Sequence, residues 1–185
     1  GGTILLNACL DYDENNGKIL LDGLACVSSP LDLSSCSQCI EKPRNSLYQK
    51  WLLNRLKNQL LEGYNDEGKL FNNQKLSKKI KGLKSIREFD EKFTAPSWGF
   101  NSLEEYYCQS SPIFRIKKLL ENLPPTLFIH AKDDPWVPYN VTRDLKKESI
   151  EKFIIIITKK GGHNGFHSSN GCWSDEAVKN WFMSI

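Results

Sequence analysis

Short apolar runs recur near both ends of the chain and are separated by polar loops or helical stretches. Residues 3–10 (TILLNACL) follow directly on two glycines and predict a short apolar helix. Residues 21–28 (LDGLACVS), 126–130 (TLFIH) and 153–158 (FIIIIT) predict buried strands, because each is a brief apolar run bounded by turn-forming residues. Apolar strands that alternate with helices predict a parallel sheet covered on both faces.

The middle of the chain has a helical periodicity instead. Apolar residues recur at helical spacing in residues 47–60 and again in residues 76–93. Gly63 is expected to end the first of these helices. A serine and a glutamate stand three positions apart in residues 85–88 and 102–105, which is the spacing of a capping box at a helix start.

This pattern divides the chain into three parts. Residues 1–33 hold the first helix and strand, residues 34–123 form a helical insertion that would cap the sheet, and residues 124–185 hold the remaining strands and helices of the core. Ser174 is expected to cap the last helix. The apolar side chains predicted to share one face of that helix are Ala177, Val178, Trp181, Phe182 and Ile185.

Composition and charge narrow the class of protein. The chain has 185 residues, of which 39% are hydrophobic and 25% are charged, and these values fit one globular domain with a sizeable core. The formal net charge is +3, and the basic residues gather mainly in residues 75–84. Aromatic residues do not interleave with them, so we expect a solvated helix face and no nucleic-acid partner.

The six cysteines follow no regular disulfide spacing. They are Cys9, Cys26, Cys36, Cys39, Cys108 and Cys172. With no signal peptide and no apolar run of membrane-spanning length, we expect reduced thiols and a cytoplasmic location. Because the chain opens without an initiator Met, a targeting or anchoring segment further upstream stays open.

Ionisable residues follow two successive predicted strands. Asp133 and Asp134 come soon after residues 126–130, and His163 follows the glycine pair that comes after residues 153–158. The carboxyl ends of parallel strands lie on one rim of the sheet, so these side chains are expected to meet there. A carboxylate beside an imidazole is the orienting half of a nucleophilic triad. An Asp-Pro turn or a surface histidine would explain each residue singly, but together they favour catalysis.

The nucleophile of such a triad is missing from the chain. The G-x-S-x-G turn that presents the serine in α/β-hydrolases does not occur in the sequence. Gly1-Gly2-Thr3 leads directly into an apolar stretch, as the trailing half of that turn would. In this interpretation Gly1 is the last glycine of the motif, and the serine lies two positions before it.

Five segments carry a family resemblance. The run "IREFDEKFTAPSWGFNSLEEYYCQSSP" is the most specific, and the others are "GGTILL", "SSPLDLSSCSQCIE", "LFIHAKDDPWVP" and "GGHNGF". They resemble the C-terminal portion of the YheT-like α/β-hydrolases, a family that includes the plant embryogenesis-associated hydrolases. The resemblance covers nearly the whole chain but only about the second half of the family's domain.

The resemblance implies an α/β-hydrolase fold that is incomplete at its N-terminus and carries a helical cap. It implies a serine hydrolase of acyl or lipid-like esters that needs no cofactor and no metal. Asp134 would be the triad acid and His163 the general base, and Asp134 is preferred over Asp133 because "DPWVP" matches the D-x-x-V-P pattern. Since the serine and the oxyanion-hole donors are absent, this chain alone is expected to be inactive.

Other functions stay open beside ester hydrolysis. The same residues suit an acyltransferase, and a non-catalytic binding or assembly module is a further alternative. Self-association through an exposed sheet edge near residues 3–10 and 21–27 is expected. The aromatic residues of the insertion would either pack together or line an acyl pocket, and they are Trp98, Phe100, Tyr106 and Tyr107.

Metal and redox chemistry are disfavoured. Cys36-x-x-Cys39 has the spacing of half a zinc site, and His163, His167 and Cys172 could be imagined as the other half. The cysteine pair, however, begins a helical insertion and not a glycine-containing knuckle. It also does not follow a strand as a thioredoxin-like CxxC does.

Overall fold

The computed structural model of the chain describes residues 1–185 except 15–18, 20, 67–73, 120, 148–150 and 170. The described residues form two compact units. The sheet unit combines residues 1–39 with residues 107–185, and the helical unit comprises residues 40–106, which lie within the predicted insertion. In the described parts of the chain, no helix is long and apolar enough to cross a bilayer.

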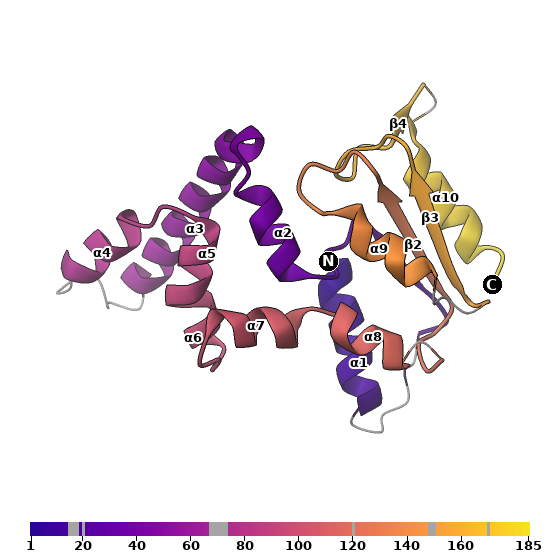
Figure 1. The fold of residues 1–185 in the computed structure, drawn as a ribbon, viewed down its shortest axis with the longest axis horizontal. Coiled ribbons are helices and arrows are strands. Elements are labelled where there is room, and N and C mark those ends of the chain that lie inside the picture. Colours follow the sequence, from indigo (N-terminus) through magenta and orange to yellow (C-terminus); the bar gives the residue numbers. More distant parts are fainter. Residues whose placement is uncertain (15–18, 20, 67–73, 120, 148–150, 170) are drawn as a thin grey trace. The chain divides into compact units, whose positions relative to one another are not determined.

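The sheet unit is built on three parallel strands (Figure 1). They are β1 (Leu24–Val27), β2 (Thr126–Ala131) and β3 (Phe153–Thr158), in the order β1-β2-β3. The register pairs Leu24 with Thr126 and Thr126 with Phe153, so the strands start level and their carboxyl ends share one rim. The three predicted strands and their parallel arrangement are confirmed.

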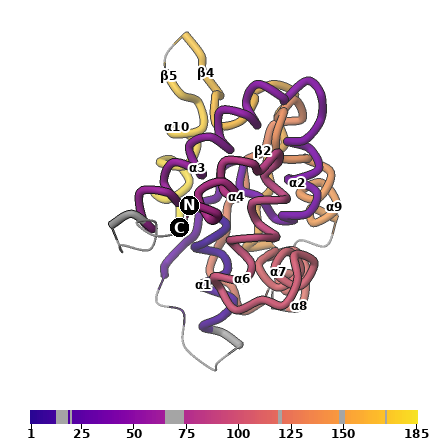
Figure 2. Tube along the Cα trace, turned by 90° about the vertical axis from the view of Figure 1, so that its left-hand side faces the viewer, coloured from indigo at the N-terminus to yellow at the C-terminus, as the bar shows by residue number. Residues whose placement is uncertain are grey.

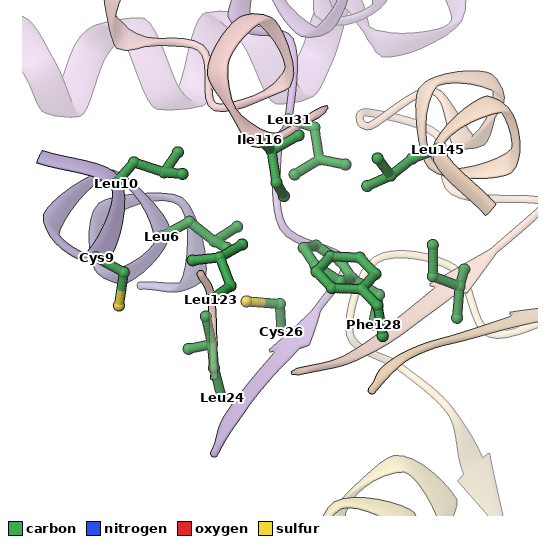
Figure 3. Close-up of a cluster of buried hydrophobic side chains, with 12 residues drawn as sticks. Leu6, Cys9, Leu10, Leu24, Cys26, Leu31, Ile116, Leu123, Phe128 and Leu145 are labelled. Carbon is green, nitrogen blue, oxygen red and sulfur yellow. The ribbon is translucent and has the colours of Figure 1, made fainter. Parts of the chain in front are cut away.

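One face of the sheet is covered by three helices. They are α1 (Gly2–Glu14), α8 (Ile113–Leu119) and α9 (Tyr139–Lys146). Figure 3 shows Leu6 of α1 and Cys26 of β1 in the core between them. Burial of an aliphatic side chain such as Leu6 stabilises the fold by ~1.5–3 kcal/mol, which explains why the apolar stretch after the two glycines forms a helix at this place.

The opposite face of the sheet is covered by α10 (Trp173–Phe182). Trp181 packs against Leu127 and Ile129, which alternate with the residues that face the other core. One detail of the predicted last helix is wrong. Its N-cap is Cys172 and not Ser174, which lies buried inside the first turn.

The predicted apolar face of this helix is only partly buried. Ala177 and Val178 pack with Trp181, whereas Phe182 and Ile185 are 44% and 53% exposed. A short antiparallel pair precedes the helix, formed by β4 (His167–Ser168) and β5 (Gly171–Cys172) (Figure 2).

One long helix and several short ones make up the helical unit. It contains η1 (Pro43–Asn45), α3 (Ser46–Asp66), α4 (Gln74–Lys81), α5 (Ile86–Phe89), η2 (Asp90–Thr94) and α6 (Ala95–Ser97). Two further helices, α2 (Leu33–Ile40) and α7 (Leu103–Ser110), run across the division between the units. The buried core of the helical unit consists of Leu53, Ile80, Leu83, Phe89 and Phe93.

The helix-boundary signals in this unit had mixed outcomes. Gly63 does not end its helix, because α3 continues to Asp66 and Tyr64 still packs against the core. Both serines cap their helices as expected, whereas each glutamate accepts a bond from the residue before the serine, Lys84 or Asn101. Glu88 N–H donates to Ser85 Oγ over 3.1 Å, and the equivalent bond to the serine of residues 102–105 measures 3.0 Å.

Candidate active site

The acid loop, residues 132–138, follows the buried strand β2. Its centre is Asp134, whose Oδ1 accepts hydrogen bonds from the backbone N–H groups of Trp136 (2.8 Å) and Val137 (2.9 Å). The backbone N–H of Asp134 itself points back to Ala131 O. The loop therefore folds around the carboxylate, which is fully buried.

The histidine loop, residues 159–166, follows β3 on the same rim. Gly165 N–H and the N–H of Phe166 donate to the carbonyl oxygen of Gly161 over 3.0 and 3.1 Å, which closes the loop into a tight turn. Gly162, with φ +57°, has the left-handed conformation that glycine adopts at low cost. Phe166 is buried beneath the loop. The glycine pair thus brings the chain back over the strand ends, as the sequence predicted.

The structure brings two of the predicted residues into contact. His163 Nδ1 lies 3.0 Å from Asp134 Oδ2, which is a normal hydrogen-bond distance. The ring of Trp136 lies beside the imidazole, with ring centroids 4.8 Å apart. Because the carboxylate is buried and the histidine side chain is 24% exposed, the imidazole lies between the acid and the open side of the site.

The surroundings of Asp134 favour its ionised form. Burial raises its pKa, but hydrogen bonds from His163 and from the backbone N–H groups of Val137 and Trp136 outweigh burial, and the pKa lies below its ordinary value. An ionised carboxylate at Nδ1 selects the tautomer that carries the proton there. Nε2 is then the nitrogen that can accept a proton from a hydroxyl group.

Asp133 makes a different contact from its neighbour. Its Oδ1 accepts a hydrogen bond of 2.9 Å from the backbone N–H of Gly162. Asp133 therefore joins the acid loop to the backbone of the histidine loop, whereas Asp134 joins it to the imidazole.

His130, the penultimate residue of β2, is a neighbour of this site that the sequence reasoning overlooked. Its ring nitrogens lie 3.1 Å from Val137 O and 3.0 Å from Thr142 Oγ1, and its Nε2 is 3.7 Å from Asp134 Oδ2. Burial lowers the pKa of His130, and a neutral ring satisfies both contacts. The signal that the sequence offers for it is a histidine near the end of an otherwise apolar strand.

The end of β1 reaches the same rim. Ser28 is buried, has φ +48°, and its Oγ lies 3.4 Å from the backbone N–H of Asn164, the residue after the histidine. Ser29 is also buried, and its hydroxyl is 3.5 Å from Val27 O. The ends of all three strands thus contribute to the surroundings of His163.

The cysteines and histidines that were weighed as zinc ligands do not come together in a metal site. Among the residues that the structure describes, no group of three or more His, Cys, Asp or Glu side chains could hold a metal ion. Cys36 and Cys39 are buried on α2, and burial raises the pKa of Cys36 to about 12, which disfavours a reactive thiolate. His167 pairs across the short hairpin with Cys172.

The helical unit contains a groove of about 410 Å³. Its walls are mainly apolar, and the lining residues are Leu56, Gln59, Leu60, Gly63, Tyr64, Phe89 and Ser97. None of the four aromatic residues predicted to pack or to line an acyl pocket is in this lining. Trp98 is 77% exposed, Tyr107 is buried, and Phe100 packs on Tyr106 with ring centroids 5.4 Å apart.

The known proteins that are similar to this chain are mainly named as esterases or lipases. A family model described as TAP-like protein matches residues 96–184. YheT of Escherichia coli strain K12, which is named as an esterase, is 34% identical over 192 residues that cover 100% of this chain and 53% of that protein. Human phospholipase ABHD3 is 30% identical over 96% of this chain and 41% of its own length. The yeast medium-chain fatty acid ethyl ester synthase/esterase 2 is 36% identical over 58% of this chain and 23% of its own length.

A parallel sheet with helices on both faces, and with an acid and a histidine joined at neighbouring strand ends, is typical of the α/β-hydrolases. Within that class, the chain is similar to YheT over its whole length, and its C-terminal half matches the TAP-like family model. The chain spans about half the length of the curated relatives it matches.

Proposed function

We propose that this chain supplies the acid and the base of a serine ester hydrolase that acts on acyl or lipid-like esters. The observation that carries the proposal is the 3.0 Å contact between His163 Nδ1 and the buried carboxylate of Asp134. The serine would lie two positions before Gly1 in the natural protein. The names of the relatives, which include an esterase and a phospholipase, support an ester as the substrate.

In the proposed reaction, His163 Nε2 takes the hydroxyl proton as the serine oxygen attacks the ester carbonyl carbon. The alcohol then leaves with that proton, and the acyl group stays on the serine. A water molecule then gives a proton to the same nitrogen as its oxygen attacks the acyl carbon. The acyl–serine bond breaks to release the acid, and the proton passes from the imidazolium to the serine oxygen. Asp134 holds the ring and stabilises the imidazolium in both halves of the reaction. The oxyanion donors would be the residue after the serine and a loop that precedes it in sequence.

Acyl transfer to an alcohol is the second candidate. The matched yeast protein is named as an ester synthase as well as an esterase, and this name favours the possibility of a competing acceptor. Transfer uses the same acyl-enzyme and the same base, with an alcohol in place of water. Product analysis with and without added ethanol separates the two reactions.

A fluorophosphonate probe tests the proposed serine. We expect the 185-residue chain to remain unlabelled and the longer protein that includes the residues before Gly1 to be labelled at the serine two positions upstream. Mass spectrometry identifies the labelled residue. Labelling of the short chain at Ser28 or Ser29 would overturn the assignment.

Two histidine variants of the longer protein complete this test. His163→Ala should slow labelling strongly, because the serine then has no base. His167→Ala is the matched control, since His167 is exposed on β4 and makes no contact with Asp134 among the described interactions. Equal labelling rates for the two variants would contradict the role of His163.

A further inference from the structure

The positive charge of the chain is concentrated in the helical unit. Residues 40–106 carry 13 basic and 9 acidic side chains, a net charge of +4, whereas the other residues carry 12 basic and 13 acidic side chains. Within the helical unit, residues 74–87 carry six basic and no acidic side chains. The rest of that unit is therefore slightly acidic, and its positive charge comes from one segment of 14 residues.

The helix α4 presents this charge on one side. Its sequence is QKLSKKIK, and Ile80 is fully buried in the core of the helical unit with Leu76 partly buried beside it. The α4 lysines, Lys75, Lys78, Lys79 and Lys81, are all exposed. At helical spacing Lys75, Lys78 and Lys81 lie on the side away from Leu76 and Ile80, and Lys79 lies at the edge between the two sides. The helix α4 therefore has one face for the core and a cationic face beside it.

The helix α4 contains no acidic side chain that would offset this positive charge. Lys57 of α3 donates to the carbonyl oxygens of Lys81 and Leu83 over 3.0 and 2.6 Å, which adds an ammonium group at the carboxyl end of α4. Lys79 Nζ also lies 5.5 Å from the ring centroid of Phe93. The nearest acidic residue after α4 in the sequence is Glu88, which binds Lys92 and the backbone of Lys84.

We propose that the α4 lysines dock the helical unit on an anionic phospholipid bilayer. Four to eight basic residues on an amphipathic helix are typical of a surface that binds phosphatidylserine, and each such residue contributes favourably near the headgroups. The face contains lysines without interleaved aromatic rings, which suits a diffuse anionic surface better than nucleic-acid bases. Docking by α4 is independent of the ester chemistry, since it requires neither the serine nor His163.

Vesicle co-sedimentation of the chain tests the proposal. We expect binding to phosphatidylcholine vesicles that contain phosphatidylserine, much weaker binding to pure phosphatidylcholine vesicles, and loss of binding as salt is raised. The triple variant Lys75→Gln/Lys78→Gln/Lys79→Gln should weaken binding on the order of 100-fold, from ~1 kcal/mol for each charge.

Two matched variants separate charge from structure. Lys75→Arg/Lys78→Arg/Lys79→Arg keeps the charge and should keep the binding. Lys50→Gln/Lys118→Gln/Lys132→Gln removes three exposed lysines elsewhere and should leave most of the binding intact. Equal binding to both vesicle types, equal losses for the two glutamine variants, or binding to an RNA duplex without binding to vesicles would each overturn the proposal.

Discussion

His130 is a buried titratable residue whose protonation should weaken the fold. The ring is 1% exposed, its two nitrogens contact Val137 O and Thr142 Oγ1, and the titratable groups facing it are Asp134 and His163. Because burial lowers the pKa of His130 in the folded chain, the unfolded chain binds a proton at higher pH than the folded chain does. The stability that the neutral ring contributes is therefore present above about pH 6.5 and is lost as the pH falls below it.

The first prediction follows from this difference. The free energy of unfolding, measured by urea titration, should decrease between pH 7 and pH 5 in the natural sequence. His130→Gln should be less stable at pH 7 by ~1–3 kcal/mol, because buried contacts are lost, but its stability should change less over the same pH range. Asp134 does not account for such a change, since its lowered pKa makes its contribution disappear only below about pH 3.9. The same pH slope in both proteins would contradict the assignment.

Among the elements, the histidine loop depends on a close contact between a glycine and an aromatic ring. A Cβ atom at Gly161 would lie 2.5 Å from Phe166 Cε1 and 3.1 Å from Ala131 Cβ. Phe166 is buried and cannot move away without opening the core under the loop. The sequence shows why glycine is useful in a turn, but only the packed structure shows which neighbour excludes a side chain.

The second prediction concerns this contact. Gly161→Ala should destabilise the chain by ~1–3 kcal/mol, as overpacked cores do. In a double-mutant cycle with Phe166→Leu, the smaller side chain should relieve part of the clash, so the double variant should lose less stability than the sum of the two single variants. Thermal unfolding of the four proteins measures the coupling. Additive losses would show that the ring is not the cause.

The sequence predicts the sheet better than it predicts the ends of helices. The strands β1, β2 and β3 are recognisable because their apolar runs are short and sharply bounded. The N-cap serines are equally local signals, and both form their bonds to the helix backbone. Gly63 failed as a stop signal, because tertiary packing around Tyr64 extends α3 beyond it.

At the site too, features that depend on tertiary contacts are not visible in the sequence. The approach of Asp134 to His163 follows from strand order and is visible in the sequence as acid and histidine loops after neighbouring strands. His130 and Ser28 were missed, because their roles depend on which side chains from different strands meet at the rim. Spacing along the chain does not contain that information.

At the scale of the whole molecule, α1 and the segment just before β1 expose apolar side chains. Ile4 is 76% exposed, Leu5 is 42% exposed and Leu21 is 41% exposed, while the neighbouring Leu6 is fully buried. Among the described residues, β1 pairs only with β2, so its other edge has no strand partner there. Exposed apolar surface beside a strand edge favours association.

The third prediction is that the purified chain self-associates through this surface. Light scattering should give a mass above the 21.2 kDa of one chain. Ile4→Lys/Leu5→Lys should shift the population toward the monomer, because the two charges would be desolvated in the contact. Leu47→Lys, at a residue that is 81% exposed on α3, is the control and should leave the association unchanged. A monomeric mass for the purified chain without substitutions would contradict this prediction.

The central claim, that Asp134 is the acid that orients His163, is tested most directly by the kinetics of two aspartate variants. The measurement is kcat/KM for a soluble acyl ester, using the longer protein that includes the residues before Gly1. Asp134→Asn should lower kcat/KM by roughly 10³–10⁴-fold, because the ring loses the carboxylate that fixes its tautomer. Asp133→Asn should remain within ~10-fold of the natural protein, since Asp133 contacts the backbone of Gly162 and an amide oxygen can accept the same bond. The reverse order of the two effects, or equal small effects, would contradict the account.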